Sequence, residues 1–338
     1  MKKLLFLVAL VAIFAACEKN SDSISEKKST PMETITAIDI TTNSALLIGR
    51  VSEEIANNKS IKYGMLISEK ESDVLSYEGK KLVGDTLLGQ TFSITATGLS
   101  AETKYYYRAY LILNSMHPEY GAIKSFMAEE SGVENNHQYV DLGLSVKWAT
   151  CNVGASKPEE YGDYFAWGET KPYYADTTIT PITWKSGKET GYDWLSYCGN
   201  DNFVEWSTPL YDASTKILKQ EYDAAHVNWG GNWRMPTKTE QDELRTECNW
   251  IWIENYNNKG VSGYIVSSKL NSNSIFLPAS GERIRLKLYY VNIFGFYWSS
   301  SLYKNIPSSA CSLFYDSDYT DWYYYGRYSG HSVRPVCQ

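Results

Sequence analysis

The sequence has little of what metal sites and nucleic-acid-binding surfaces require. It contains four histidines and six cysteines in 338 residues, and neither a CxxC pair nor a clustered His/Cys spacing occurs. We therefore expect no metal site and no other cofactor. The formal net charge is −7, which provides no basic surface for a nucleic-acid partner.

Long apolar runs are equally scarce. After residue 16 none is long enough to span a bilayer, and the early run Leu4–Ala16 is too short for a comfortable membrane span. That run follows Lys2-Lys3 and ends at Ala15-Ala16-Cys17, which predicts a signal peptide over residues 1–16. The boundary resembles a bacterial lipoprotein signal. The resemblance implies lipidation of Cys17, a membrane partner through that lipid, and an outer-membrane location at the cell surface.

The chain beyond the signal peptide suggests two domains more than one. Residues 17–32 are polar and predict a flexible tether, and about 300 residues follow it. Five cysteines remain in an exported chain, so at least one is unpaired, and the sequence does not choose among the connectivities. They are Cys151, Cys198, Cys248, Cys311 and Cys337.

Residues 33–128 alternate apolar and polar side chains in short runs, which predicts a β-sandwich. In "AETKYYYRAYLIL" the alternation places Tyr105, Tyr107 and Ala109 on one face. The segment "GLSAETKYYYRAYL" resembles the penultimate strand of a fibronectin type III domain. We interpret its tyrosines as core and rim, and we see no catalytic constellation in this domain.

The segment 129–138 is polar and lacks periodicity, so we predict a linker there. Residues 139–338 combine short strand-like pieces with much loop and predict an α+β domain. Thr237 and Glu240 form a capping box that opens a helix through Leu244 towards Trp250. Trp229, Trp233 and Arg234 flank a Gly230-Gly231 turn, and we interpret them as packing residues rather than ligand-stacking residues.

Six motifs occur in order in this second domain: "DLGLSVKWATCNVGA", "GDYFAWGE", "WGGNWRMPT", "SIFLPASG", "YWSSS" and "SVRPV". Together they resemble the Fibrobacter succinogenes major paralogous domain family. The resemblance implies a C-type lectin-like fold, similar to that of the formylglycine-generating enzyme, in an extracytoplasmic and usually lipid-anchored domain. The expected fold class is therefore mainly β and α+β, a β-sandwich followed by a C-type lectin-like domain.

The residues required for two activities of similar folds are absent from this sequence. Oxidation of the formylglycine-generating type needs closely spaced redox cysteines, whereas Cys311 and Cys337 are far apart in sequence. Calcium-dependent sugar binding needs Glu-Pro-Asn or Gln-Pro-Asp, and neither tripeptide is present. We expect no catalysis.

The last fifty residues hold the strongest signal for binding. In residues 284–331, Tyr, Ser, Asp and Asn alternate with short motifs of the paralogous-domain family, such as "YWSSS", and the motif "SVRPV" follows them. This pattern resembles the variable region of proteins that are diversified by adenine mutagenesis through a retroelement. Tyr supplies large contact area at small conformational cost, so this composition predicts a face that binds a protein or a glycan. The predicted ligand-binding residues are Tyr303, Asn305, Tyr315, Asp318, Tyr319, Tyr323, Tyr324, Tyr325 and Tyr328.

Two alternative roles of the tyrosines would give the same composition. One is a Tyr-rich sheet face packed against the first domain or the tether. The second is a structural or adhesive subunit of the fimbrial type, which would use the face to meet a neighbouring chain. The least favoured hypothesis is that the chain is an accessory domain of a hydrolase or an oxidase.

Overall fold

The computed structural model describes residues 30–338 except 59, 88, 115–116, 129–131, 174, 177–182, 185–190, 199–209 and 272. The predicted signal peptide, Cys17 and nearly all of the tether lie outside the described residues. Met32, predicted as the last residue of the tether, already belongs to the first strand and is buried. The fold is mainly β, with antiparallel sheets throughout, as predicted.

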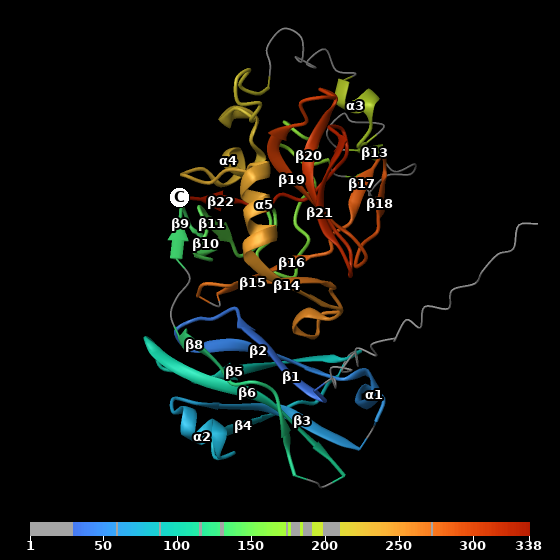
Figure 1. The fold of residues 1–338 in the computed structure, drawn as a ribbon. Helices are drawn as coiled ribbons and strands as arrows, with labels where there is room; N and C mark the ends of the chain where they lie inside the picture. The colour runs from blue at the N-terminus through green and yellow to red at the C-terminus, as the bar shows by residue number, and fades with distance from the viewer. Residues whose placement is uncertain are drawn as a thin grey trace, which may run out of the picture.

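The N-terminal domain is a sandwich of two antiparallel sheets (Figure 1). The first sheet has the order β1-β2-β5, formed by Met32–Ile38, Ser44–Val51 and Thr91–Thr97. The second has the order β4-β3-β6-β7, with β8 also paired to β6, formed by Lys80–Val83, Ile61–Ser68, Thr103–Leu113, Glu119–Tyr120 and Lys124–Ala128. Two short helices, α1 and α2, cover Glu53–Ala56 and Glu71–Leu75.

The core of the sandwich confirms the predicted alternation along β6. Tyr105, Tyr107 and Ala109 are buried and pack with Leu47 and Met65 from the facing sheet and from β3. The backbone N–H of Ser100 donates to the Tyr105 hydroxyl at 3.0 Å, which ties the preceding turn to the strand. The tyrosines of this segment are therefore largely core residues, and α2 covers the other face of β6 through Val74.

The C-terminal domain consists of small sheets and short helices. One sheet has the order β22-β11-β10-β9; the others are β12-β13, β14-β15-β16, β17-β18 and β19-β20-β21. The strands are β9 Gly132–Glu134, β10 His137–Val140, β11 Lys147–Ala149, β12 Ala175–Asp176, β13 Thr183–Trp184, β14 Cys248–Ile253, β15 Gly263–Ser268, β16 Ser274–Pro278, β17 Glu282–Ile284, β18 Lys287–Tyr289, β19 Gly295–Leu302, β20 Ser309–Tyr315, β21 Thr320–Gly326 and β22 Val336–Cys337. The helices are α3 Trp194–Cys198, η1 Gln220–Tyr222, α4 Ala224–Trp229, α5 Lys238–Glu247 and η2 Tyr256–Asn258.

The segment predicted as a linker is mostly a β-hairpin. β9 pairs with β10 through Gly132 and Tyr139, and the turn between them contains Asn135 and Asn136, both at positive φ. Asparagine tolerates this conformation, and two such residues in a row form the turn that suits a tight hairpin. The polar residues without periodicity indicated a turn and not a linker. Residues 132–138 therefore belong to the second domain, which corrects the prediction for this part of the segment.

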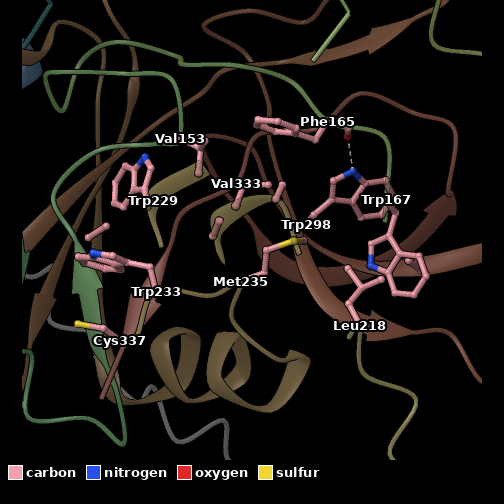
Figure 2. Close-up of a cluster of buried hydrophobic side chains, with 14 of the residues drawn as sticks. Val153, Phe165, Trp167, Leu218, Trp229, Trp233, Met235, Trp298, Val333 and Cys337 are labelled. Carbon is pink, nitrogen blue, oxygen red and sulfur yellow. Dashed lines mark hydrogen bonds between the residues drawn. The ribbon is translucent and has the colours of Figure 1, made fainter. Parts of the chain in front are cut away.

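A tryptophan-rich cluster forms one core of the C-terminal domain (Figure 2). Trp229 and Trp233 are buried in it, as predicted, and His137 stacks on Trp229 with ring centroids 3.8 Å apart. The Trp298 indole donates to the Phe165 carbonyl at 2.8 Å. The cluster joins β11, α4 and β19, which are far apart in sequence, and so holds the small sheets together.

Helix α5 confirms the predicted capping box. The Thr237 hydroxyl accepts from the Glu240 backbone N–H, and the Glu240 carboxylate accepts from the Thr237 backbone N–H. The same carboxylate pairs with Arg234 at 2.6 Å. The helix ends at Glu247, earlier than predicted, because residues from Cys248 onward pair with β15 as strand β14.

The two domains share an apolar interface between the β1-β2-β5 sheet and the β14-β15-β16 sheet (Figure 1). Ile35, Ile38 and Ile48 pack there against Tyr256 and Phe276. The Tyr256 hydroxyl donates to the Asp39 carboxylate, and the Ser274 hydroxyl donates to the Ala37 carbonyl at 3.2 Å. The sandwich therefore has a defined contact with the second domain.

Cys151, Cys248, Cys311 and Cys337 are all buried free thiols. The side chain of Cys198 lies outside the described residues. Among the helices that the structure describes, none has the length and apolar character needed to cross a bilayer.

Candidate binding surface

The predicted ligand-binding tyrosines lie on and around the β19-β20-β21 sheet, of which β21 is an outer strand. Successive side chains of a strand point to opposite faces of the sheet. Tyr323 and Tyr325 therefore lie on one face of β21, and Trp322 and Tyr324 lie on the other. The predicted residues form two surfaces instead of one.

The first surface is a row of five rings, which we call the aromatic strip: Tyr289, Tyr290, Phe294, Phe314 and Tyr323. Their ring centroids are separated in turn by 5.9, 5.0, 5.4 and 5.6 Å. Tyr290 is 47% exposed and Tyr323 is 43% exposed, whereas Phe294 and Phe314 are partly buried between them. The strip joins the end of β18 to β20 and β21.

The segment that carries the first three rings of the strip also has exposed aliphatic side chains. Ile293 beside the strip is 54% exposed, and Leu286 and Leu288 of the β17-β18 hairpin are also exposed. Tyr319 lies at the other end, where its hydroxyl donates to the Asp321 carboxylate at 2.6 Å. A continuous row of partly exposed rings marks an interaction surface more often than it marks a random feature of the surface.

The second surface lies on the side of the sheet that faces α5. The rings of Tyr303 and Tyr324 stack with centroids 4.2 Å apart and planes 8° apart. The Lys238 ammonium of α5 lies 4.0 Å from the centroid of the Trp322 ring. These rings have partners within the domain, although Tyr324 is still exposed.

Two of the predicted ligand-binding residues are not on a free surface. Tyr315 is fully buried, and its hydroxyl donates to the carbonyls of Leu277 and Pro278, each at 2.9 Å. The prediction for Tyr315 is therefore wrong, because the β15-β16 strands cover this face of β20. Tyr325 is half-buried against Phe296 and His331, and burial raises its pKa.

The remaining predicted residues lie outside the strip, in turns and beside α3. Asn305 is exposed in the β19-β20 turn, and Asp318 is exposed in the β20-β21 turn, where its backbone N–H donates to Asp316 at 2.9 Å. Tyr328 is partly buried beside Trp194, with ring centroids 6.2 Å apart. Cys311 and Ser312, which belong to the set that resembles a diversified region, are buried in β20.

Sequence reasoning missed most of the strip. Tyr289, Tyr290, Phe294 and Phe314 were not among the predicted residues, although all four lie in 284–331. A usable signal was present: apolar residues alternate with Arg283, Arg285 and Lys287 and end in Tyr289-Tyr290, which is a pattern typical of an exposed hairpin.

A buried polar series lies beneath the sheet. The Ser312 hydroxyl is 3.0 Å from His331 Nδ1, and His331 Nε2 is 3.4 Å from a Glu282 oxygen. The order serine, histidine, carboxylate is that of a hydrolase triad. However, Ser312 and His331 are 0% exposed, so no substrate carbonyl reaches the hydroxyl, and the series acts as internal polar pairing.

The buried His331 predicts a pH dependence of stability. Burial lowers its pKa from the ordinary value, so the imidazole stays neutral in the folded protein while the unfolded chain takes up a proton near pH 6.5. The free energy of unfolding should therefore fall as pH decreases from about 7.5 to about 5.5. Urea midpoints across this range should show a smaller fall in His331→Gln than in wild type. Equal slopes in the two proteins would contradict this assignment.

The thiols that the structure describes do not have the properties of redox catalysts. Burial raises the pKa of Cys311 to about 11, and it also raises the pKa of Cys337. A catalytic thiol needs the opposite shift, because the thiolate is the nucleophile. In the part of the chain that the structure describes, no three His, Cys, Asp or Glu side chains gather as a metal site would require.

No protein-family model matches the chain, and no curated protein matches it. Solved structures show weak similarity. The sensor domain of the anti-sigma factor RsgI4 in Pseudobacteroides cellulosolvens is 16% identical, with 30% of this chain and 97% of that chain covered and a TM-score of 0.23. A fibronectin type III domain of the human KIAA0970 protein is 18% identical, with 31% and 77% covered and a TM-score of 0.22. At these TM-scores the assignment of the sandwich rests on its strand topology.

Proposed function

We propose that this chain is a cell-envelope lipoprotein, anchored through Cys17, whose C-terminal domain recognises a macromolecule without catalysis. The observation that carries the proposal is the aromatic strip, a continuous row of rings that is open to solvent at Tyr289, Tyr290 and Tyr323. The fibronectin type III-like sandwich serves as the spacer between the anchor and the lectin-like domain that carries this surface.

The residue types of the strip suit binding of a large partner. Tyrosine and phenylalanine bury much area with few rotatable bonds, and such residues account for most of the energy at protein interfaces. The strip is a surface rather than a closed cleft, which suits a macromolecule better than a small molecule. Asp318, which lines one surface hollow together with Phe294 of the strip, is exposed and able to form part of a polar rim.

The ring orientations favour a protein over a glycan. Neighbouring planes in the strip are tilted by 39°, 44°, 57° and 87°. A row of sugar rings stacks best on coplanar aromatic faces, whereas tilted rings present edges and faces to side chains of mixed shape. A protein ligand is therefore our first choice.

A structural or adhesive subunit is the second candidate, and the outer position of β21 favours it. A seven-residue strand at the end of a sheet offers unpaired backbone groups to a neighbouring chain. In that case the neighbour would add to β21 along its edge, and association would depend on the backbone more than on the rings of the strip.

The test replaces Tyr290 and Tyr323 with alanine, singly and together, in a non-lipidated Cys17→Ser chain. Ligands are first found with immobilised envelope proteins and a glycan panel, and each one bound by the parent chain is titrated against the variants. We expect each substitution to weaken binding about 30-fold, since a central aromatic anchor contributes about 2 kcal/mol. The melting temperature should change little, because both rings are exposed.

Tyr324→Ala is the matched control. This ring is exposed to a similar degree but lies on the opposite face of β21, so binding should stay within about twofold of the parent chain. Affinity that survives both strip substitutions, or that falls only with Tyr324→Ala, would rule out the strip as the recognition surface.

A further inference from the structure

A hollow of ≈ 140 Å³ lies at the joint between the two domains, away from the aromatic strip. The sandwich contributes Ile38, Asp39, Ile40 and Met127 to its wall. The C-terminal domain contributes residues of β9, β10 and β16, together with single residues that directly follow β10 and β11 or precede β16. The residues lining the hollow from this side are Gly132, Tyr139, Val140, Asp141, Thr150, Asn273, Ser274, Ile275 and Phe276.

The walls are held in place by the packing of the domain interface. Ile38 and Phe276 belong to the apolar cluster that joins the two sheets, and both are almost fully buried. Arg50 also donates to the Trp252 carbonyl across the joint at 3.1 Å. Well-packed interiors contain few voids larger than a water molecule, so a hollow of this size between two fixed layers is a space that a ligand is able to fill.

The size and the wall chemistry define what fits. Ile38, Val140, Ile275 and Phe276 provide an apolar floor, and an apolar cavity of about 150 Å³ is large enough for benzene. The exposed members of the lining are Asp39, Asp141 and Met127, so two carboxylates stand at the mouth.

The charges at the mouth have one sign. Asp39 accepts from the Tyr256 hydroxyl through one oxygen, and Asp141 accepts from the Gly143 N–H through one oxygen, so each carboxylate keeps a second oxygen for another donor. Among the described residues that line the hollow there is no Lys, Arg or His. The Lys147 ammonium lies 5.0 Å from the centroid of a tyrosine ring in the wall but is not part of the lining.

We propose that this hollow binds a small molecule that consists of one apolar ring and a protonated amine. The ring occupies the floor formed by Ile38 and Phe276, and the ammonium group at the mouth donates to Asp39 and Asp141. Ligand sites are frequent at domain interfaces, and a buried apolar surface with a few convergent polar groups is their usual form. This site is independent of the proposed recognition surface.

The experiment titrates the full non-lipidated chain with benzylamine and, as the probe of opposite charge, with benzoate. The buffer is kept at about pH 7.5, where the carboxylates are ionised. Although Asp39 is exposed at the mouth, the protein packed around its carboxyl group partly desolvates it and raises its pKa to about 6. Binding is followed by the isoleucine δ1-methyl signals in NMR spectra. We expect benzylamine to bind in the millimolar range and to shift the methyl signals of Ile38, Ile40 and Ile275. The methyl signal of Ile94, elsewhere in the sandwich, should stay in place, and benzoate should cause no shift.

Two variants and one control test the carboxylates. Asp39→Asn and Asp141→Asn keep the shape and an acceptor oxygen but remove the negative charge. Each should weaken benzylamine binding about tenfold, because a hydrogen bond between two charged groups becomes a weaker one to a neutral acceptor. Asp85→Asn removes an exposed charge outside the hollow and should have no effect. The double variant in Tyr290 and Tyr323 should also bind benzylamine normally, which separates this proposal from the recognition surface.

The proposal is overturned by any of three results. Benzylamine shifts no methyl signal of the hollow at millimolar concentration, benzoate binds as tightly as benzylamine, or both asparagine variants bind like the parent chain.

Discussion

Replacing Arg334 with alanine is expected to lower the free energy of unfolding of the C-terminal domain by about 4 kcal/mol. The guanidinium group is 1% exposed and donates to Asn152 Oδ1 at 2.8 Å, to the Ala149 carbonyl at 3.0 Å and to the Phe276 carbonyl at 2.9 Å. Alanine would leave these three buried acceptors without a donor and would open a cavity. The loss is large because a buried acceptor left without a donor costs more free energy than its hydrogen bond contributes, in net terms, to folding.

The measurement is urea unfolding followed by tryptophan fluorescence. All eleven tryptophans lie between residues 148 and 322, so the signal reports the C-terminal domain alone. Arg285→Ala is the matched control, since its side chain is 78% exposed and such substitutions change stability by no more than about 0.5 kcal/mol. Arg334→Lys retains the charge but not the planar fork, so it should recover only part of the loss. A midpoint for Arg334→Ala equal to that of the control would contradict the role assigned to this arginine.

Replacing Tyr315 with alanine is the second change for which we expect a large effect, a loss of about 3–5 kcal/mol in unfolding free energy. The ring is fully buried and packs against Tyr297 and Tyr264, with ring centroids 5.9 Å and 5.4 Å away. It also covers Gly295 of the neighbouring strand, where a Cβ atom would lie 2.0 Å from the ring. Truncation therefore removes packing from strands β15 and β19 at once.

Two variants complete this test. Tyr315→Phe keeps the ring but removes the hydroxyl that donates to the Leu277 and Pro278 carbonyls. Because the Pro278 carbonyl still accepts from the Tyr297 hydroxyl at 2.7 Å, this variant should cost only about 1 kcal/mol. Tyr323→Ala removes a 43% exposed ring and should cost less than about 1 kcal/mol. The same fluorescence-detected unfolding ranks the three variants. If Tyr323→Ala destabilised the domain as much as Tyr315→Ala, the strip would be core and the proposed recognition surface would fail.

Tyr315 and Tyr323 show what the amino-acid composition of a segment predicts and what it does not. Both belong to the Tyr-rich segment that predicted a binding face, and both lie on strands of one sheet. Tyr323 is exposed because β21 is an outer strand and nothing described covers that face completely, whereas Tyr315 is covered by β15 and β16. Composition identified a segment that is rich in tyrosine, yet it did not separate an exposed tyrosine from a core tyrosine.

The buried polar residues show a second limit. Ser312 and His331 lie nineteen positions apart and Glu282 lies further away, so no sequence spacing pointed to the series that they form. Arg334 appeared only within the motif "SVRPV", and nothing in that motif indicated that its partners come from β11 and β16.

By itself, the sequence determined the features that depend on neighbours along the chain. The alternation in β6 determined which of its tyrosines enter the sandwich core, and the Thr237/Glu240 spacing determined where α5 begins, because these periodicities follow from local backbone geometry. Only the tertiary structure decided which aromatic rings meet solvent and which meet one another. The aromatic strip unites residues 289, 290, 294, 314 and 323. Its existence depends on which face of the sheet is covered, and strands remote in sequence decide that.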